Sequence, residues 1–190
     1  MMILVTGGSG SGKSAFAEDC VVASGTEKRI YIATMYPFDE ESKKRVQRHR
    51  KMRQGKGFET IECYTGLSQV EVPAKSTVLL ECMSNLTANE MFQEDGAHEN
   101  TVDAVMNGVR QLKEQAENLI IVTNEIFSEA VSYQGETDTY QKYLGTINQQ
   151  LGSLADEVVE VVYGIPVYHK KLLQRKQEGC VGCEKSVEQF

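Results

Sequence analysis

Short apolar runs alternate with longer polar stretches along the whole chain. Six runs of five or six residues, most of them rich in valine, isoleucine and leucine, have the length and composition of buried strands. Most are too continuously apolar for a sheet with one face in water, which favours a parallel sheet covered on both faces. The runs cover residues 2–6, 29–33, 58–63, 77–81, 119–123 and 157–162.

The polar stretches between these runs have the length and pattern of helices. They cover residues 13–22, 39–52, 85–92, 101–117 and 137–155. Strand and helix in alternation predict an α/β protein with three layers and a mainly parallel central sheet. Ligands of such folds bind at the carboxyl ends of the strands. We expect one domain over residues 1–169, followed by a polar extension over residues 170–190. From about residue 169 onward we expect the chain to be solvated or frayed.

The composition narrows the class of protein. The chain has 190 residues, of which 41% are hydrophobic and 25% charged, as in an average globular domain. Its apolar runs fall short of the ~20 residues that cross a bilayer, and residues 1–6 lack the basic segment of a secretory signal. A net charge of −7 argues against a general nucleic-acid-binding protein. We expect a cytoplasmic protein with no membrane span and no nucleic-acid partner.

The five cysteines are mostly scattered and form no disulfide framework, which is typical of a reducing cytosol. Cys180 and Cys183 form a close pair within the expected extension. Such a pair could ligate zinc, but a closed zinc site needs four ligands. The sequence offers no second pair, which favours two free thiols.

The strongest chemical signal lies between the first strand and the first helix, where residues 7–14 match the pattern G-x-x-x-x-G-K-[ST]. Glycines let the backbone wrap a phosphate with several N–H groups at once, and the helix N-terminus adds partial positive charge. Lys13 would reach the β- and γ-phosphates, and the Ser14 hydroxyl would ligate Mg²⁺. A flexible glycine-rich turn is the alternative, but the flanking elements favour a P-loop NTPase-type fold. The predicted nucleotide-binding residues of the loop are Gly7, Gly8, Ser9, Gly10, Ser11, Gly12, Lys13 and Ser14.

A P-loop enzyme also needs an acidic group near its magnesium ion, usually at the end of a neighbouring strand. Glu81 directly follows three apolar residues of the run 77–81 and is the first candidate. Glu125, just after the run 119–123, is the second. Either could instead be a solvated acid at a strand end. We predict that Ser14 and Glu81 hold Mg²⁺.

A basic segment stands out in this acidic protein. In a helix, Arg45, His49 and Arg53 would share one stripe, because they are spaced four residues apart. Two guanidiniums could hold a polyphosphate while the imidazole faces phosphorus, and nearby positive charge would keep His49 neutral and nucleophilic. A solvated basic face with an incidental histidine remains the alternative. We treat His98 and His169 as ordinary surface residues.

These segments together resemble the bifunctional adenosylcobinamide kinase/adenosylcobinamide-phosphate guanylyltransferase family, over about residues 1–170. Beside the phosphate loop, the segment R-V-Q-R-H-R at residues 45–50 resembles the family pattern R-[IV]-x-x-H-[RK]. Further similar segments follow in the family's order, at residues 31–34, 79–82, 122–125, 147–149, 155–158 and 164–167. Gly10 is a departure, because the family usually has an arginine there.

The resemblance implies two reactions. One transfers a phosphoryl group from ATP or GTP to the hydroxyl of the aminopropanol arm of adenosylcobinamide. The other transfers GMP from GTP to adenosylcobinamide phosphate through a guanylyl-histidine, which falls on His49, and releases pyrophosphate. It also implies a homotrimer with active sites near the subunit interfaces. The further nucleotide-binding positions that it implies are Ala33, Thr34, Met35, Arg50, Lys51, Met52, Arg53, Glu62 and Glu81.

Two other functions stay open at this point. A P-loop kinase of another small alcohol would use Lys13, Ser14 and Glu81 but would need no covalent role for His49. A nucleotide-dependent switch is the second, although the sequence has neither an N-K-x-D guanine-specificity motif nor a second domain. The loop and the basic segment could serve one nucleotide site or two. Recognition of a corrinoid rests wholly on the resemblance.

Overall fold

The computed structural model describes residues 1–125 and 135–171. Within these ranges the chain forms a seven-stranded sheet with strand order β3-β2-β4-β5-β1-β6-β7. Neighbouring strands are parallel except β6 and β7, which are antiparallel. The sheet is therefore mainly parallel, as predicted. The strands are β1 (Met2–Thr6), β2 (Arg29–Ala33), β3 (Phe58–Glu62), β4 (Thr77–Glu81), β5 (Asn118–Val122), β6 (Glu157–Val162) and β7 (Ile165–Lys170).

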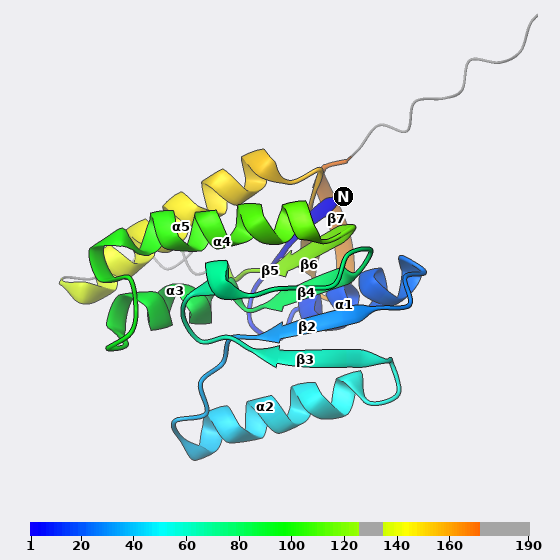
Figure 1. Cartoon of the computed structure of the whole chain (residues 1–190), viewed down its shortest axis with the longest axis horizontal. Helices are drawn as coiled ribbons and strands as arrows, with labels where there is room; N and C mark the ends of the chain where they lie inside the picture. The colour runs from blue at the N-terminus through cyan, green and yellow to red at the C-terminus, as the bar shows by residue number, and fades with distance from the viewer. Residues whose placement is uncertain (126–134, 172–190) are drawn as a thin grey trace, which may run out of the picture.

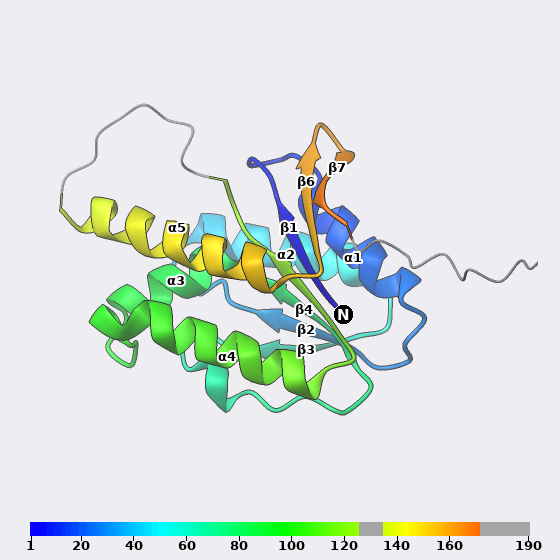
Figure 2. The same ribbon diagram turned by 90° about the horizontal axis from the view of Figure 1, so that it is seen from above.

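Helices cover both faces of this sheet (Figures 1 and 2). Three of them, α3, α4 and α5, pack on one face in a core that includes Leu4 of β1. Helix α1 packs on the other face in a second core that includes Val5. Successive residues of β1 thus point to opposite faces, which gives the three predicted layers. The helices are α1 (Lys13–Ala23), α2 (Glu40–Arg53), α3 (Met83–Phe92), α4 (Thr101–Gln115) and α5 (Glu136–Leu154), with short 3₁₀ turns η1 (Leu67–Gln69) and η2 (His98–Asn100).

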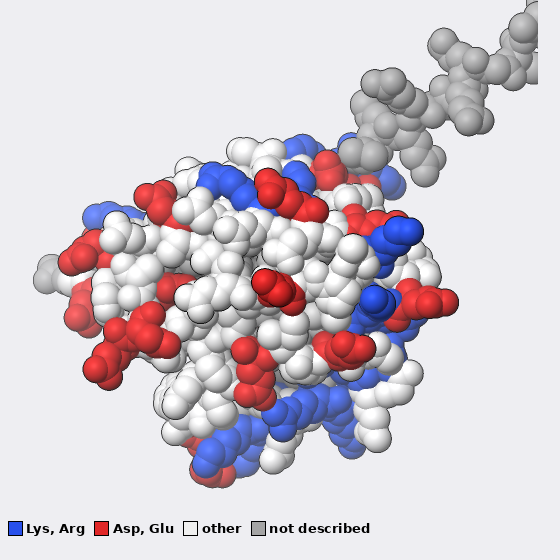
Figure 3. All heavy atoms as spheres, viewed as in Figure 1, with Lys and Arg blue, Asp and Glu red and all other residues white. Residues whose placement is uncertain are grey.

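Helix α2 differs from the other helices because it lies along the β3 edge of the sheet (Figure 1). Its only buried residues are Ser42 and Arg53, both polar. Basic side chains gather over α2 at the lower edge of the molecule (Figure 3). Strand β3 is correspondingly half exposed, in contrast to β4, which is buried throughout. The basic side chains of α2 therefore form a surface, and the side of the helix that packs against the protein is polar.

All six predicted strands and all five predicted helices are present, with ends within two residues of those expected. Strand β7 was not predicted, and the expectation of a frayed segment is wrong for His169 and Lys170, which belong to it. All residues of β7 are exposed, and Pro166 lies at the sheet edge, where its missing N–H costs little. Residues 165–168 are largely apolar, but a proline inside a short run argues against a strand, so sequence analysis missed β7.

Most of the predicted extension, including Cys180 and Cys183, lies outside the described residues, so the division at residue 170 stays a prediction. The three cysteines within the described ranges are free thiols. No helix in residues 1–125 and 135–171 combines the length and apolarity that crossing a membrane requires.

Candidate active site

The phosphate loop joins β1 to α1 at the carboxyl edge of the sheet. Gly7, Gly10 and Gly12 all have positive φ values, of 146°, 73° and 94°, which glycine adopts without steric cost. A Cβ atom on Gly7 would also lie 2.6 Å from the carbonyl oxygen of Val161. The glycine composition of the loop is thus required by its backbone shape and by its contact with β6.

Lys13, the first residue of α1, is 8% exposed, and its Nζ donates a hydrogen bond to the carbonyl of Gly8 at 3.0 Å. The ammonium group therefore spans the loop in the position from which it would meet a phosphate. Burial lowers the pKa of Lys13, while Cys82 and Glu81 act in the opposite direction.

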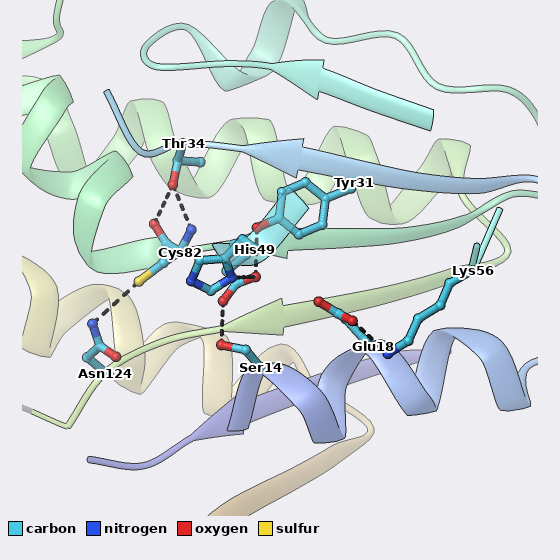
Figure 4. A network of polar contacts seen from close by, with 9 residues as sticks. Ser14, Glu18, Tyr31, Thr34, His49, Lys56, Cys82 and Asn124 are labelled. Carbon is cyan, nitrogen blue, oxygen red and sulfur yellow. Dashed lines mark hydrogen bonds and ion pairs between the residues drawn. The ribbon is translucent and has the colours of Figure 1, made fainter. Parts of the chain in front are cut away.

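Glu81 is the centre of the polar network at this edge. Figure 4 shows its three partners, Ser14, Tyr31 and His49, gathered from different elements. The residue is 6% exposed, and its carboxylate accepts hydrogen bonds from Ser14 Oγ at 2.5 Å and Tyr31 Oη at 2.7 Å. Nδ1 of His49 lies 3.4 Å from Oε2 of the same carboxylate. Burial acts to raise the pKa of Glu81, but His49 and the two hydroxyl donors outweigh it and hold the pKa below its usual range. An ionised carboxylate is thereby held inside the site.

The two ends of α2 explain how His49 reaches Glu81. At the first turn, Asp39 caps the helix by accepting from the Ser42 amide at 2.6 Å, in a capping box. At the last turn, the Arg53 guanidinium stacks 3.3 Å from the centre of the Tyr31 ring. Just beyond, Lys56 pairs with the buried Glu18 of α1 at 2.7 Å. The helix is thus fixed mainly at its C-terminal end, one turn from His49.

The three residues of the predicted stripe, Arg45, His49 and Arg53, differ in how deeply they are buried. His49 and Arg53 are largely buried, whereas Arg45 is mostly exposed and pairs with Glu41 one turn away. The ion-pair partner of His49 is a carboxylate, although the sequence predicted guanidinium groups around it. His49 Nδ1 makes no hydrogen bond within the described residues.

A cavity of about 550 Å³ lies between the phosphate loop and α2. It brings together most of the predicted site: Ser9, Gly10, Ser11, Gly12, Lys13, Ser14, Ala33, Met35, His49, Arg50, Met52, Arg53, Glu62 and Glu81. Arg50 and Glu62 pair with each other at its rim, at 3.1 Å. The predicted loop and the predicted basic helix therefore face one space.

Four predicted residues do not line this cavity. Gly7 and Gly8 form the start of the loop, and Lys51 is exposed on the far side of α2. Thr34 is fully buried, and its hydroxyl accepts from the Cys82 amide at 2.6 Å and donates to the Cys82 carbonyl at 2.9 Å. Its hydroxyl thus contacts the chain segment that follows Glu81. The predicted nucleotide contact of Thr34 stays a prediction.

Residues 3–168 match the sequence model of a protein family described as cobinamide kinase / cobinamide phosphate guanyltransferase. The chain belongs to this family. A "Bifunctional adenosylcobalamin biosynthesis protein CobU" of Escherichia coli is 32% identical over 181 residues, covering 88% of this chain and 98% of the relative. The protein of the same name from Salmonella typhimurium is 31% identical over the same shares of both chains. A CobP protein of Pseudomonas aeruginosa is 27% identical, with 88% and 96% covered.

Solved structures agree on the fold of this cobinamide kinase family member. One of them, described as an ATPase domain, superposes with a TM-score of 0.55 at 9% identity, covering 90% of this chain and 77% of that one. An ATPase from a bacterial type III secretion system gives 0.52, also at 9% identity, covering 84% and 50%. Identities this low show the fold alone, and that fold is the predicted P-loop α/β architecture.

Sequence analysis did not identify several residues that line the cavity of this family member. Tyr31 precedes the predicted position Ala33 on β2, and its hydroxyl holds Glu81. Asn124 follows β5, and its Nδ2 donates to Ser84 Oγ at 2.7 Å beside Cys82 Sγ. Burial raises the pKa of the Cys82 thiol. The carboxyl ends of neighbouring parallel strands meet at one edge of the sheet. A polar residue directly after a strand was therefore the sequence signal that could have indicated a site residue.

The residues expected to hold Mg²⁺ lie next to one another. Ser14 and Glu81 offer a hydroxyl and an ionised carboxylate, the hard oxygen ligands that Mg²⁺ prefers, beside a loop built for phosphates. These donors fit the ion. Glu125 is exposed at the other strand end, and its amide donates to the Gly7 carbonyl at 3.4 Å. Among the described residues no group of three or more histidine, cysteine or acidic side chains could hold a metal.

Proposed function

We propose that the protein phosphorylates adenosylcobinamide with ATP or GTP and then transfers GMP from GTP to adenosylcobinamide phosphate through guanylylated His49. The product is adenosylcobinamide-GDP, an intermediate of cobalamin biosynthesis. The observation that carries the proposal is the shared cavity, because the phosphate loop and His49 open onto one space and are joined through Glu81. Membership of the family supplies the substrate class.

In the proposed kinase step, the loop amides and Lys13 bind the triphosphate. The acceptor hydroxyl oxygen bonds to the γ-phosphorus while the bond from that phosphorus to the departing diphosphate breaks, and the hydroxyl proton leaves to water. Ser14 and Glu81 would hold Mg²⁺, which neutralises charge on the phosphates when it is bound. The low pKa of Glu81 supports this role, because the carboxylate is ionised at neutral pH.

In the proposed nucleotidyl step, a ring nitrogen of His49 bonds to the α-phosphorus of GTP and pyrophosphate departs. A phosphate oxygen of adenosylcobinamide phosphate then displaces the histidine and forms the new phosphoanhydride. Glu81 faces Nδ1 and favours the proton on that atom, which leaves the Nε2 lone pair as the nucleophile. A neutral imidazole avoids the direct encounter of two anions, and Arg50 at the rim can offset charge on the departing pyrophosphate.

A kinase that phosphorylates another alcohol would account for the phosphate loop. It would not account for the position of His49. A basic helix that carries its histidine into the cavity and against Glu81 favours group transfer over a solvated helix face. A nucleotide-dependent switch would likewise not require a histidine that faces the cavity and contacts Glu81.

The covalent intermediate provides the direct test. Wild-type protein is incubated with Mg²⁺ and GTP labelled at the α-phosphorus, and the protein is examined for an acid-labile, base-stable adduct. His49→Ala should form no adduct, whereas the control His98→Ala, an exposed histidine of η2, should be labelled like wild type. An adduct that persists in His49→Ala would remove His49 as the attachment point. Conversion of adenosylcobinamide to its phosphate and GDP forms is followed in parallel.

The homotrimer and the cytoplasmic location are further proposals that rest on the family resemblance. Light scattering during size-exclusion chromatography tests the first. A mass three times that of the chain is expected, and a monomer would contradict it.

A further inference from the structure

The turn between β6 and β7 lies against the phosphate loop, on the side away from α2. Figure 2 shows the tip of this hairpin at the same end of the sheet as the loop between β1 and α1. The amide of Gly164 donates to the carbonyl of Ser11 at 2.8 Å. A Cβ atom on Gly12 would lie 3.3 Å from the Cα of Gly164. The hairpin tip is therefore in direct contact with the rim of the loop.

Tyr163 occupies this turn in an unfavourable way. The turn has two residues, Tyr163 and Gly164, with φ values of 51° and 80°, and it connects the paired residues Val162 and Ile165. Positive φ at both positions favours asparagine or glycine in the first and is strained for a bulky side chain. Tyr163 is also 93% exposed, so its ring contributes little to the core. Its place in the turn is explained neither by backbone preference nor by packing.

The strand order places the hairpin on the side of the phosphate loop away from Glu81. From Glu81 on β4, the sheet runs through β5 to β1, which carries the phosphate loop, and on to β6 and β7. Lys13 and Glu81 both line the cavity, so a γ-phosphate bound between them would face it. Because the attacking and departing oxygens of phosphoryl transfer are roughly in line, the rest of the nucleotide extends away from the cavity. That direction leads across the loop to the hairpin tip.

We propose that Tyr163 is a stacking platform for the purine base of the phosphate donor. This inference rests on the proposed kinase function and adds the binding site of the base to it. An aromatic ring stacks on any purine, so the contact serves ATP and GTP alike and does not select between them. The guanine of the GMP carried on His49 lies on the other side of the loop, in the cavity beside α2.

The test compares MgATP with inorganic tripolyphosphate, which has the phosphates but no base. ATP is used because it is not the donor of the proposed guanylyl transfer. Tyr163→Asn removes the ring while providing a residue that suits the turn, and Tyr163→Gly is a second variant of the same kind. Tyr163→Phe keeps the ring. The matched control is Tyr168→Thr, because Tyr168 is a half-exposed tyrosine of the same strand pair, distant from the turn in the β6–β7 register.

Titration calorimetry should give a Kd for MgATP about tenfold higher in Tyr163→Asn and Tyr163→Gly, the lower end of what base stacking contributes. Tyr163→Phe and Tyr168→Thr should bind ATP like wild type, and tripolyphosphate should bind all variants equally. An unchanged Kd for ATP in both ring-free variants would overturn the inference. Equal weakening of ATP and tripolyphosphate would also overturn it, because the turn would then act on the loop and not on the base.

Lys13→Ala separates this inference from the proposed function. If the phosphate loop holds the triphosphate, this variant loses both ATP and tripolyphosphate, whatever the result at Tyr163. If Lys13→Ala binds both as wild type does, the proposed function fails at the loop itself.

Discussion

Nδ1 of His49 and Oε2 of Glu81 lie 3.4 Å apart, although one residue comes from α2 at the edge of the sheet and the other from the interior strand β4. Their side chains are only 14% and 7% exposed. Glu81 also accepts the hydroxyl of Ser14, which belongs to the phosphate loop. One carboxylate thus connects the proposed nucleophile of one reaction to the proposed metal and phosphate site of the other.

Glu81→Gln should impair both proposed reactions, because the neutral amide keeps the size of the side chain and loses its charge. We expect roughly a 10- to 100-fold fall in kcat for each reaction, the usual effect of losing a group that orients a histidine or ligates a metal. The guanylyl adduct should form slowly but still form, since Glu81 does not bond to phosphorus. Steady-state rates and the initial rate of labelling measure these effects.

The chain offers a matched control for this variant. Glu160 on β6 pairs with His169 at 2.8 Å and is a second glutamate–histidine pair, on the surface. Glu160→Gln should leave both rates unchanged. A fall in only one of the two activities of Glu81→Gln would contradict a shared role for the carboxylate.

The low pKa of Glu81 predicts a pH dependence of stability. The pKa is below its ordinary value of 4.5 in the folded protein, so the unfolded chain binds the proton more tightly. The ionised carboxylate therefore stabilises the fold above about pH 4.5, and this contribution is lost as the pH falls through the lower folded-state pKa. The groups that face it are His49, Ser14, Tyr31 and Lys13.

Urea unfolding at a series of pH values measures this contribution. The free energy of unfolding of wild type should exceed that of Glu81→Gln by more at pH 6 than at pH 3.5. A difference that is constant across this range would mean that Glu81 titrates alike in the folded and unfolded states.

The sequence predicted the parts of the site that are contiguous along the chain. The phosphate loop could be identified because its glycines, Lys13 and Ser14 are adjacent and follow a buried strand. The meeting of His49 and Glu81 could not be predicted, because it depends on how α2 docks, and α2 has no apolar stripe to indicate its buried side. Strand β7 was missed for another reason, since Pro166 interrupts its short apolar run and argues against a strand.

Gly7→Ala should destabilise the protein through two effects at one position. The φ of Gly7 is 146°, and the added Cβ atom would lie 2.6 Å from the Val161 carbonyl oxygen, so β6 and the loop would have to separate. We expect a loss of about 1–3 kcal/mol in the free energy of unfolding.

Gly152→Ala is the matched control, because a Cβ atom there meets no described atom within 4 Å and alanine suits the interior of α5. It should be neutral or stabilising by up to about 1 kcal/mol. Equal effects of the two substitutions in urea unfolding would refute this account of the loop.

Thr34→Val tests whether Thr34 contacts nucleotide or positions the chain. The resemblance implied a nucleotide contact, whereas the buried hydroxyl bonds both the amide and the carbonyl of Cys82. Valine keeps the shape but leaves the Cys82 amide without its hydrogen-bond partner, while the Cys82 carbonyl keeps the Leu86 amide as a donor at 3.1 Å. The free energy of unfolding should therefore fall by about 1–3 kcal/mol.

The kinetics of the same variant distinguish the two roles. Since Cys82 follows Glu81, displacement of this segment should lower kcat, while KM for ATP changes by less than about twofold. Thr146→Val is the control, because Thr146 is exposed on α5 and its hydroxyl donates to the carbonyl of Lys142 in the preceding turn. It should alter neither stability nor rate. The opposite result is a Thr34→Val protein with wild-type stability and a strongly raised KM for ATP. It would assign Thr34 to nucleotide binding, because loss of a direct contact weakens binding without disturbing the fold.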